Sequence, residues 1–172
     1  TLTGYIFTVN DVAPWFTWIV IKPYGPGHYI HGFAVVSNVF RALNGAIDRV
    51  ESVDTTFADL DYGRMKNVSF LHNTFNAVVN EAINPASIAF TQGSASATWT
   101  ISAAPYMPFG GRARVVEQVV AEGRLISSAG ATVYEMPYVE TEIGTNKDEF
   151  RLRFGTACRG SVRVLARMDL PI

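Results

Sequence analysis

Histidines are the residues of this chain most suited to holding a metal ion, and two of them stand close together. His28 and His31 have an H-x-x-H spacing, and His72 is the only other histidine. A metal ion usually needs three or four protein donors in a fixed geometry. Two histidines in a glycine-rich loop therefore predict ordinary hydrogen-bonded side chains, and we expect no metal site.

An acidic segment with Glu51, Asp59 and Asp61 follows. It lacks the regular oxygen-ligand spacing of a calcium loop, so it predicts a solvated acidic loop. The chain has no G-x-G-x-x-G or G-x-x-x-x-G-K-[ST] phosphate loop and no G-x-S-x-G turn. Cys158 is the only cysteine, which excludes an intrachain disulfide and predicts a passive small residue. We therefore expect no cofactor and no enzymatic activity.

Composition bears on partners more than on chemistry. The 172 residues suffice for one domain with a sizeable core, and the net charge of −1 provides no basic surface for nucleic acid. Charged residues make up 17% of the chain, against about 25% in an ordinary soluble domain, while aromatic residues reach 12%. The exterior is therefore either neutral and polar or covered by other subunits. Because aromatic residues and Arg are enriched in interfaces, we expect a homo-oligomer.

The clearest element is a pair of alternating segments near the end of the chain, Phe150–Phe154 and Ser161–Asp169. Apolar residues alternate with Arg151 and Arg153 in the first segment and with Arg163, Leu165 and Arg167 in the second, so one face of a sheet should be buried and the other polar. The six residues between them predict a looped hairpin. The expected core residues of this pair are Phe150, Leu152, Phe154, Val162, Val164 and Met168.

The rest of the chain divides near residue 86. Apolar residues at helical spacing predict helices over Phe33–Val50 and Phe70–Ile83. Beyond them, short strands recur about every ten residues with glycine turns, as in a sandwich or barrel. The prediction is a single all-β domain over residues 1–172, a single jelly-roll barrel or sandwich with one or two helices.

The loop Pro105–Gly111 is the candidate contact between subunits. Tyr106, Met107 and Phe109 lie together between turn residues and would form an exposed apolar patch. The competing interpretation is that this loop folds back over an open end of the barrel. Trp15 and Trp18 fall in expected strands and predict core or interface packing.

Two family resemblances imply different functions. His31-Gly32 ahead of the helical segment Phe33–Val50 resembles the layout of hotdog-fold acyl thioesterases and dehydratases. Those enzymes place a carboxylate in or beside the central helix, whereas the first carboxylate here is Asp48, near the end of the segment. This resemblance is the alternative interpretation.

The run Ser87–Leu170 resembles, in length and strand layout, single jelly-roll capsid proteins such as the small major capsid proteins of Thermus-infecting, membrane-containing icosahedral phages. That resemblance implies a structural protein of the virion shell that assembles with copies of itself or with a second capsid protein near an internal membrane. It also implies a chain that is soluble and cytoplasmic before assembly. It implies no direct contact with nucleic acid.

Overall fold

The computed structural model describes residues 1–170 and confirms an all-β fold. The helices in this part of the chain are two three-residue 3-10 turns, η1 (Tyr62–Arg64) and η2 (Pro108–Gly110). The described chain divides into two compact units, whereas the sequence predicted one barrel domain. The first unit comprises residues 1–85, 105–111 and 168–170, and the second comprises residues 86–104 and 112–167.

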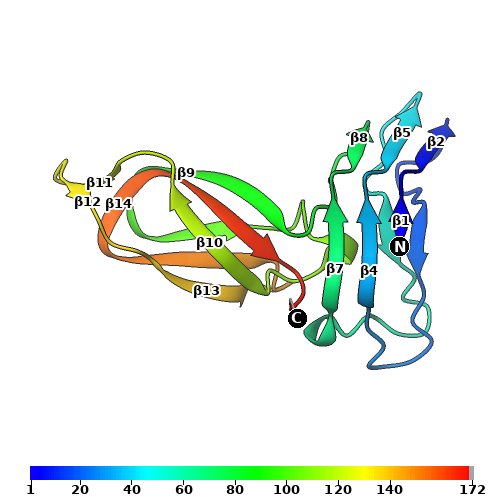
Figure 1. Ribbon diagram of the computed structural model, residues 1–172. Coiled ribbons are helices and arrows are strands. Elements are labelled where there is room, and N and C mark those ends of the chain that lie inside the picture. Colours follow the sequence, from blue (N-terminus) through cyan, green and yellow to red (C-terminus); the bar gives the residue numbers. More distant parts are fainter. Residues whose placement is uncertain (171–172) are drawn as a thin grey trace. The chain divides into compact units, whose positions relative to one another are not determined.

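The first unit is built from parallel strands that stack in three columns (Figure 1). The columns are β1 (Leu2–Thr3), β4 (His31–Val36) and β7 (Lys66–Leu71); β2 (Ile6–Asn10), β5 (Val39–Leu43) and β8 (Thr74–Asn76); and β3 (Ile19–Ile21) and β6 (Glu51–Val53). Val35 lies opposite both Leu2 and Phe70, so each coil of the chain stacks on the preceding one. This is the arrangement of a parallel β-helix, in which neighbouring coils bury a continuous core. It contains parallel pairs instead of the antiparallel pairs of a jelly roll.

The two helices predicted from the sequence are therefore strands and turns, which is a correction. Phe33–Val50 holds β4 and β5, separated by Ser37 with a φ of 55°, and Phe70–Ile83 holds the end of β7 and β8, separated by His72 with the same φ. A left-handed residue ends each strand and turns the chain into the next column. The segment Phe33–Val50 therefore does not form the central helix on which the resemblance to hotdog-fold enzymes was based.

An asparagine ladder joins the turns between the first two columns. The Asn38 side chain donates from Nδ2 to the Leu2 carbonyl at 3.0 Å and to Asn73 Oδ1 at 3.1 Å, and its Oδ1 accepts from the Tyr5 amide at 3.0 Å. Asn73 in turn donates to the Val35 carbonyl at 2.9 Å. Equivalent turns of successive coils are thus bonded to each other and kept in register.

Aromatic rings at equivalent positions of the coils form a stack beside this ladder. Phe7, Phe40 and Phe75 follow one another along the second column, with centroid separations of 4.9 and 5.7 Å and interplanar angles of 5° and 10°. Phe40 is fully buried. The stack therefore runs through the core of the β-helix along its axis.

The last coil is covered by segments from later in the chain. Asp169 accepts from the Val68 amide at 2.9 Å and from Asn84 Nδ2 at 2.8 Å, and Asn84 also donates to the Val68 carbonyl. Phe109 packs edge-on against Phe70 at 5.7 Å. Backbone groups at the edge of β7 are thus satisfied within the first unit.

The second unit is one six-stranded antiparallel sheet centred on β14 (Figure 1). Its strands are β9 (Ala86–Ser102), β10 (Val115–Ala121), β11 (Leu125–Ser127), β12 (Thr132–Val133), β13 (Tyr138–Ile143) and β14 (Glu149–Arg167). The two segments predicted as a looped hairpin are a single strand, β14, with register shifts against β9 between Arg153 and Gly160. The predicted alternation is confirmed, because the six expected core residues are all buried.

Candidate functional site

A pocket of about 400 Å³ in the first unit is the best candidate for a ligand site. It lies beside β6 and the segments that precede and follow it. Polar residues outnumber apolar ones in its lining, which consists of Trp15, Thr17, Asp48, Arg49, Glu51, Ser52, Val53, Thr55, Asp59, Tyr62, Phe109 and Gly110. Ligand pockets for small molecules commonly have this size, with a few polar groups that orient the ligand. We call it the Trp15 pocket.

Trp15 contributes an aromatic surface to this pocket. Its side chain is 82% exposed, which is unusual for the largest apolar residue. The turn that carries it is fixed by a hydrogen bond of 2.8 Å from the Asp48 amide to the Pro14 carbonyl. The backbone that carries Trp15 is therefore fixed at the pocket, while the indole itself is largely exposed. The sequence predicted a packed strand residue here, but the strand begins only at Ile19.

Glu51 is the buried acid of the pocket. It is 1% exposed, and its Oε1 accepts from the Phe109 amide at 3.1 Å and from Arg49 Nη1 at 3.2 Å. Its other oxygen, Oε2, has no hydrogen-bond partner among the described residues. Burial raises the pKa of Glu51 above its ordinary value, although the Arg49 guanidinium and the hydrogen bonds oppose the shift. A protonated Oε2 would be a hydrogen-bond donor.

The remaining polar side chains of the pocket are held by the β-helix. Asp48 accepts from Asn80 Nδ2 at 2.6 Å, and Arg49 donates to the Met107 carbonyl at 3.0 Å. The Tyr62 hydroxyl donates to the Phe109 carbonyl at 2.7 Å. With Asp59, the pocket has three carboxyl groups and one guanidinium. Its polar surface is thus preorganised and acidic.

The acidic segment was predicted to be a solvated loop, but its acidic residues have different surroundings in the structure. Glu51 and Asp59 line the Trp15 pocket, and Glu51 is buried, which corrects the prediction for that residue. Asp61 instead caps η1 by accepting from the Gly63 amide at 3.1 Å. No spacing in the sequence marks Glu51 as buried, because its burial depends on Phe109 in a distant loop.

The histidines do not form a site. His28 Nδ1 accepts from the Tyr24 amide at 3.2 Å, His31 opens β4, and His72 lies in the turn between β7 and β8. Within residues 1–170, no group of three or more His, Cys, Asp or Glu side chains is arranged to hold a metal ion. Cys158 is buried, and burial raises the pKa of its thiol, as does the Glu135 carboxylate, so it is a poor nucleophile.

The candidate interface loop folds back onto its own unit. Met107 and Phe109 are buried, and Tyr106 is half-buried, with its carbonyl accepting from the Ile83 amide at 2.8 Å. These residues therefore form no exposed apolar patch, and the competing interpretation of a loop that covers an open end describes them better. The end that it covers belongs to the β-helix.

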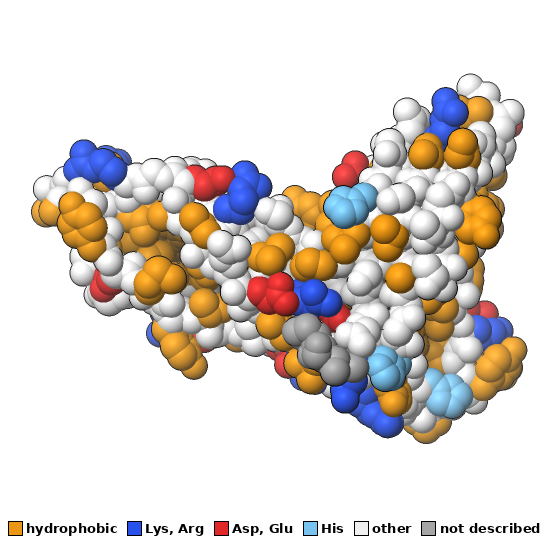
Figure 2. Space-filling view, in the orientation of Figure 1, with side chains coloured by type: hydrophobic (Ala, Val, Ile, Leu, Met, Phe, Trp, Pro, Cys, Tyr) orange, Lys and Arg blue, Asp and Glu red, His pale blue; other side chains and the backbone are white. Residues whose placement is uncertain are grey.

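Exposed apolar residues occur in both units, and three of them lie close together on the segment around β12 and β13 of the second unit. Tyr134, Met136 and Tyr138 are among the most exposed large side chains of the described chain. The sequence analysis did not single them out, although their alternation with Glu135 and Pro137 is visible in the sequence. Figure 2 shows hydrophobic side chains gathered over the end of the second unit where β11 and β12 lie.

No helix of residues 1–170 combines the length and the apolar character that crossing a membrane requires. Comparison with known proteins found no matching family model, no matching curated protein and no matching solved structure.

Proposed function

We propose that the first unit binds a saccharide chain, neutral or carrying amino groups, in the Trp15 pocket. The observation that supports this function is an exposed indole beside a preorganised set of acidic and hydroxyl side chains. A saccharide ring has an apolar C–H face and a rim of hydroxyl groups. The two kinds of surface in the pocket match these two parts of a sugar.

Recognition would follow from hydrogen bonds around one stacked ring. The Trp15 indole would cover the C–H face and remove apolar area from water. Asp48 and Asp59 are exposed and can accept hydrogen bonds from sugar hydroxyls.

The charge of the pocket limits the class of sugar. Glu51 is paired with Arg49, so the exposed carboxylates of Asp48 and Asp59 set the charge of the pocket and repel an anionic ligand at short range. Chains of uronic acids would therefore bind poorly, whereas amino sugars would gain from the carboxylates and from cation–π contact with Trp15.

Calorimetric titration with three sets of oligosaccharides tests this proposal: neutral glucose or mannose chains, glucosamine chains and galacturonate chains. We expect binding of a neutral or amino series, with galacturonate chains weakest. Trp15→Ala should raise Kd at least about 10-fold. Tyr24→Ala is the matched control, because Tyr24 is 73% exposed and does not line the pocket. Absence of binding in all three series, or equal losses in both variants, would overturn the proposal.

A structural role in a virion is the second candidate function, and the exposed apolar side chains of the second unit favour it. In this role the chain would be a capsid protein that assembles with copies of itself or a second capsid protein, near an internal membrane. The protein would then act by binding, without catalysis. Electron microscopy of the concentrated protein, alone and with candidate partner chains, tests this role. Images that contain single molecules and no regular assemblies would count against it.

A further inference from the structure

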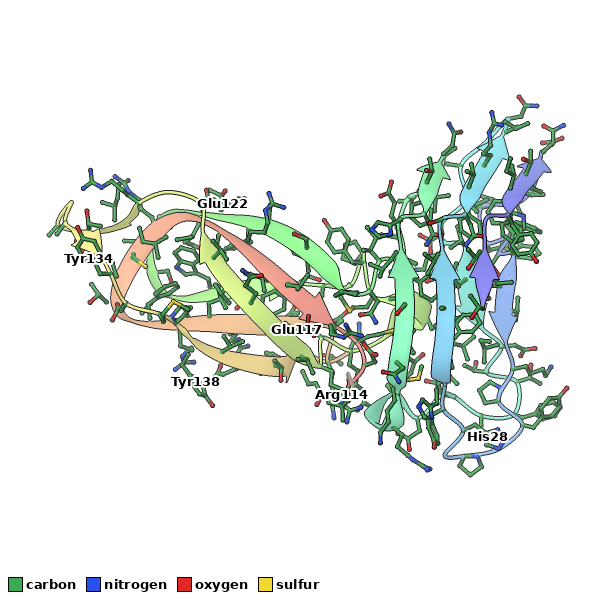
Figure 3. The ribbon with its side chains drawn as sticks, in the orientation of Figure 1. His28, Arg114, Glu117, Glu122, Tyr134 and Tyr138 are labelled. Atoms are coloured by element: carbon green, nitrogen blue, oxygen red, sulfur yellow. The ribbon has the colours of Figure 1, made fainter. Side chains whose placement is uncertain are left out.

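The extended run from Thr132 to Tyr138 presents three large apolar side chains on one face. Tyr134, Met136 and Tyr138 are 92%, 77% and 71% exposed, and we call them the apolar strip. The residues between them are half-buried, as the two-residue period of an extended chain requires. Figure 3 shows Tyr134 at the end of the second unit and Tyr138 projecting away from its ribbon.

Three successive outward positions with large apolar side chains are unusual for an extended segment at the surface, where polar residues are expected. Contiguous apolar surface of this kind marks an interaction site. We infer that the apolar strip is the contact with a second copy of this chain, packed strip against strip. The inference does not depend on the Trp15 pocket.

The low charge of the apolar strip is compatible with contact between the strips of two copies. A two-fold interface brings the same patch of both copies together, so any uncompensated charge would face its like. Glu135 is the only acidic or basic residue between positions 131 and 139. Its carboxylate accepts a hydrogen bond of 2.6 Å from the Thr156 amide of its own chain. The strip itself therefore carries one charge, which is already hydrogen-bonded within its own chain.

The area of the strip is enough for the central part of a dimer contact. Each buried aromatic side chain removes about 150–250 Å² from water, so the two tyrosines supply about 300–500 Å². A stable interface needs about 800 Å² from each partner, so these side chains would form its apolar centre. A hollow of about 320 Å³ adjoins Tyr134 and Met136, with Ala121 and Leu125 in its lining. This hollow can receive an apolar side chain of the second copy.

Part of the backbone of the strip is also free to pair, whereas Tyr138 lies in β13 and already pairs with Arg153 of β14. Residues 134–137 belong to no strand, and no backbone hydrogen bond to Tyr134, Glu135 or Met136 is formed within residues 1–170. Unpaired amide and carbonyl groups on an extended segment are a template for pairing with another chain. Two antiparallel strips could therefore add main-chain hydrogen bonds to the side-chain contact.

Sedimentation equilibrium tests this inference with the native chain and a Tyr134→Ser, Met136→Ser, Tyr138→Thr variant. We expect a native oligomer and a Kd at least about 10-fold higher for the variant, because central aromatic anchors carry most of an interface's affinity. Tyr24→Ser, at an exposed tyrosine of the first unit, should leave Kd unchanged. A monomeric native chain at high concentration, or an equally associated triple variant, would overturn the inference.

Cross-linking gives a second readout that does not require the triple variant to fold. Met136→Cys should form a disulfide between copies on mild oxidation, because strip-to-strip packing brings the two positions close together. Tyr24→Cys is the control and should remain uncross-linked, while the native Cys158 is buried in both variants. Equal cross-linking of both variants, or none at position 136, would contradict strip-to-strip packing.

Discussion

Replacing Asn38 by alanine should destabilise the first unit by about 3 kcal/mol, because it removes the centre of the asparagine ladder. The side chain makes three hydrogen bonds, to the Leu2 carbonyl, the Tyr5 amide and Asn73. Each contributes on the order of 1 kcal/mol net. Asn38 is 1% exposed, so water cannot readily replace the lost partners of the buried groups.

Native-state amide exchange measures this loss in the first unit directly, since the two units need not unfold together. A loss of about 3 kcal/mol corresponds to roughly a hundredfold faster exchange of the most protected amides of β4 and β5. The Tyr5 amide should lose its protection first. Asn76→Ala is the control, because Asn76 is exposed on β8. A change below about 0.5 kcal/mol in Asn38→Ala, or an equal change in the control, would refute the ladder as a source of stability.

Three further predictions concern the core, a glycine and a buried acid. Val164→Asp should unfold the second unit or cost more than about 4 kcal/mol in thermal melting, because Val164 is fully buried and the new charge has no partner. Gly160→Ala should lower the free energy of unfolding, measured with urea, by about 1–3 kcal/mol, because φ is +149° and a Cβ would lie 2.8 Å from Leu125 Cδ2. Gly93→Ala should leave it unchanged, because no atom lies within 4 Å of a Cβ there. Because the pKa of Glu51 is raised in the folded state, its contribution to stability should be complete below its ordinary pKa of 4.5 and should be lost as pH rises through the raised pKa. Urea midpoints should therefore fall with rising pH over this range in the native protein, and should fall less in Glu51→Gln.

Opposite results would be informative in each case. An unchanged melting curve for Val164→Asp would mean that the assignment of the two faces of β14 is wrong. Equal midpoints for the two glycine variants would show that the Leu125 side chain moves away from the new methyl group without a loss of stability. A native stability that rises with pH above 4.5 relative to Glu51→Gln would mean that Arg49 outweighs burial in setting the pKa of Glu51.

The sequence alone determined the β character of the chain and the buried face of its last strand. Successive side chains of a strand point to opposite faces, so the alternation of apolar residues with arginines from Phe150 to Met168 leaves one choice for the core. Burial of all six predicted residues follows from this local rule. Local pattern did not show that β14 continues through Gly155 and Gly160, because its pairing with β9 and β11 holds the strand together there.

The tertiary structure decided the form of the first unit. Val36, Val39, Phe40 and Leu43 fit a helical stripe, and the local signals against it are Gly45 and the β-branched residues. In the structure a left-handed Ser37 divides this segment, and each half pairs with strands one coil away. Such pairing is non-local, so short-range periodicity cannot reveal it.

The candidate sites depend on the same long-range contacts. Trp15 and Glu51 lie one coil apart in the sequence, and the Trp15 pocket includes both because β3 stacks on β6. The loop with Phe109 then buries Glu51 by supplying the amide that its carboxylate accepts. The sequence specified these residue types, but only the stacking of coils and the return of a distant loop placed them in one pocket.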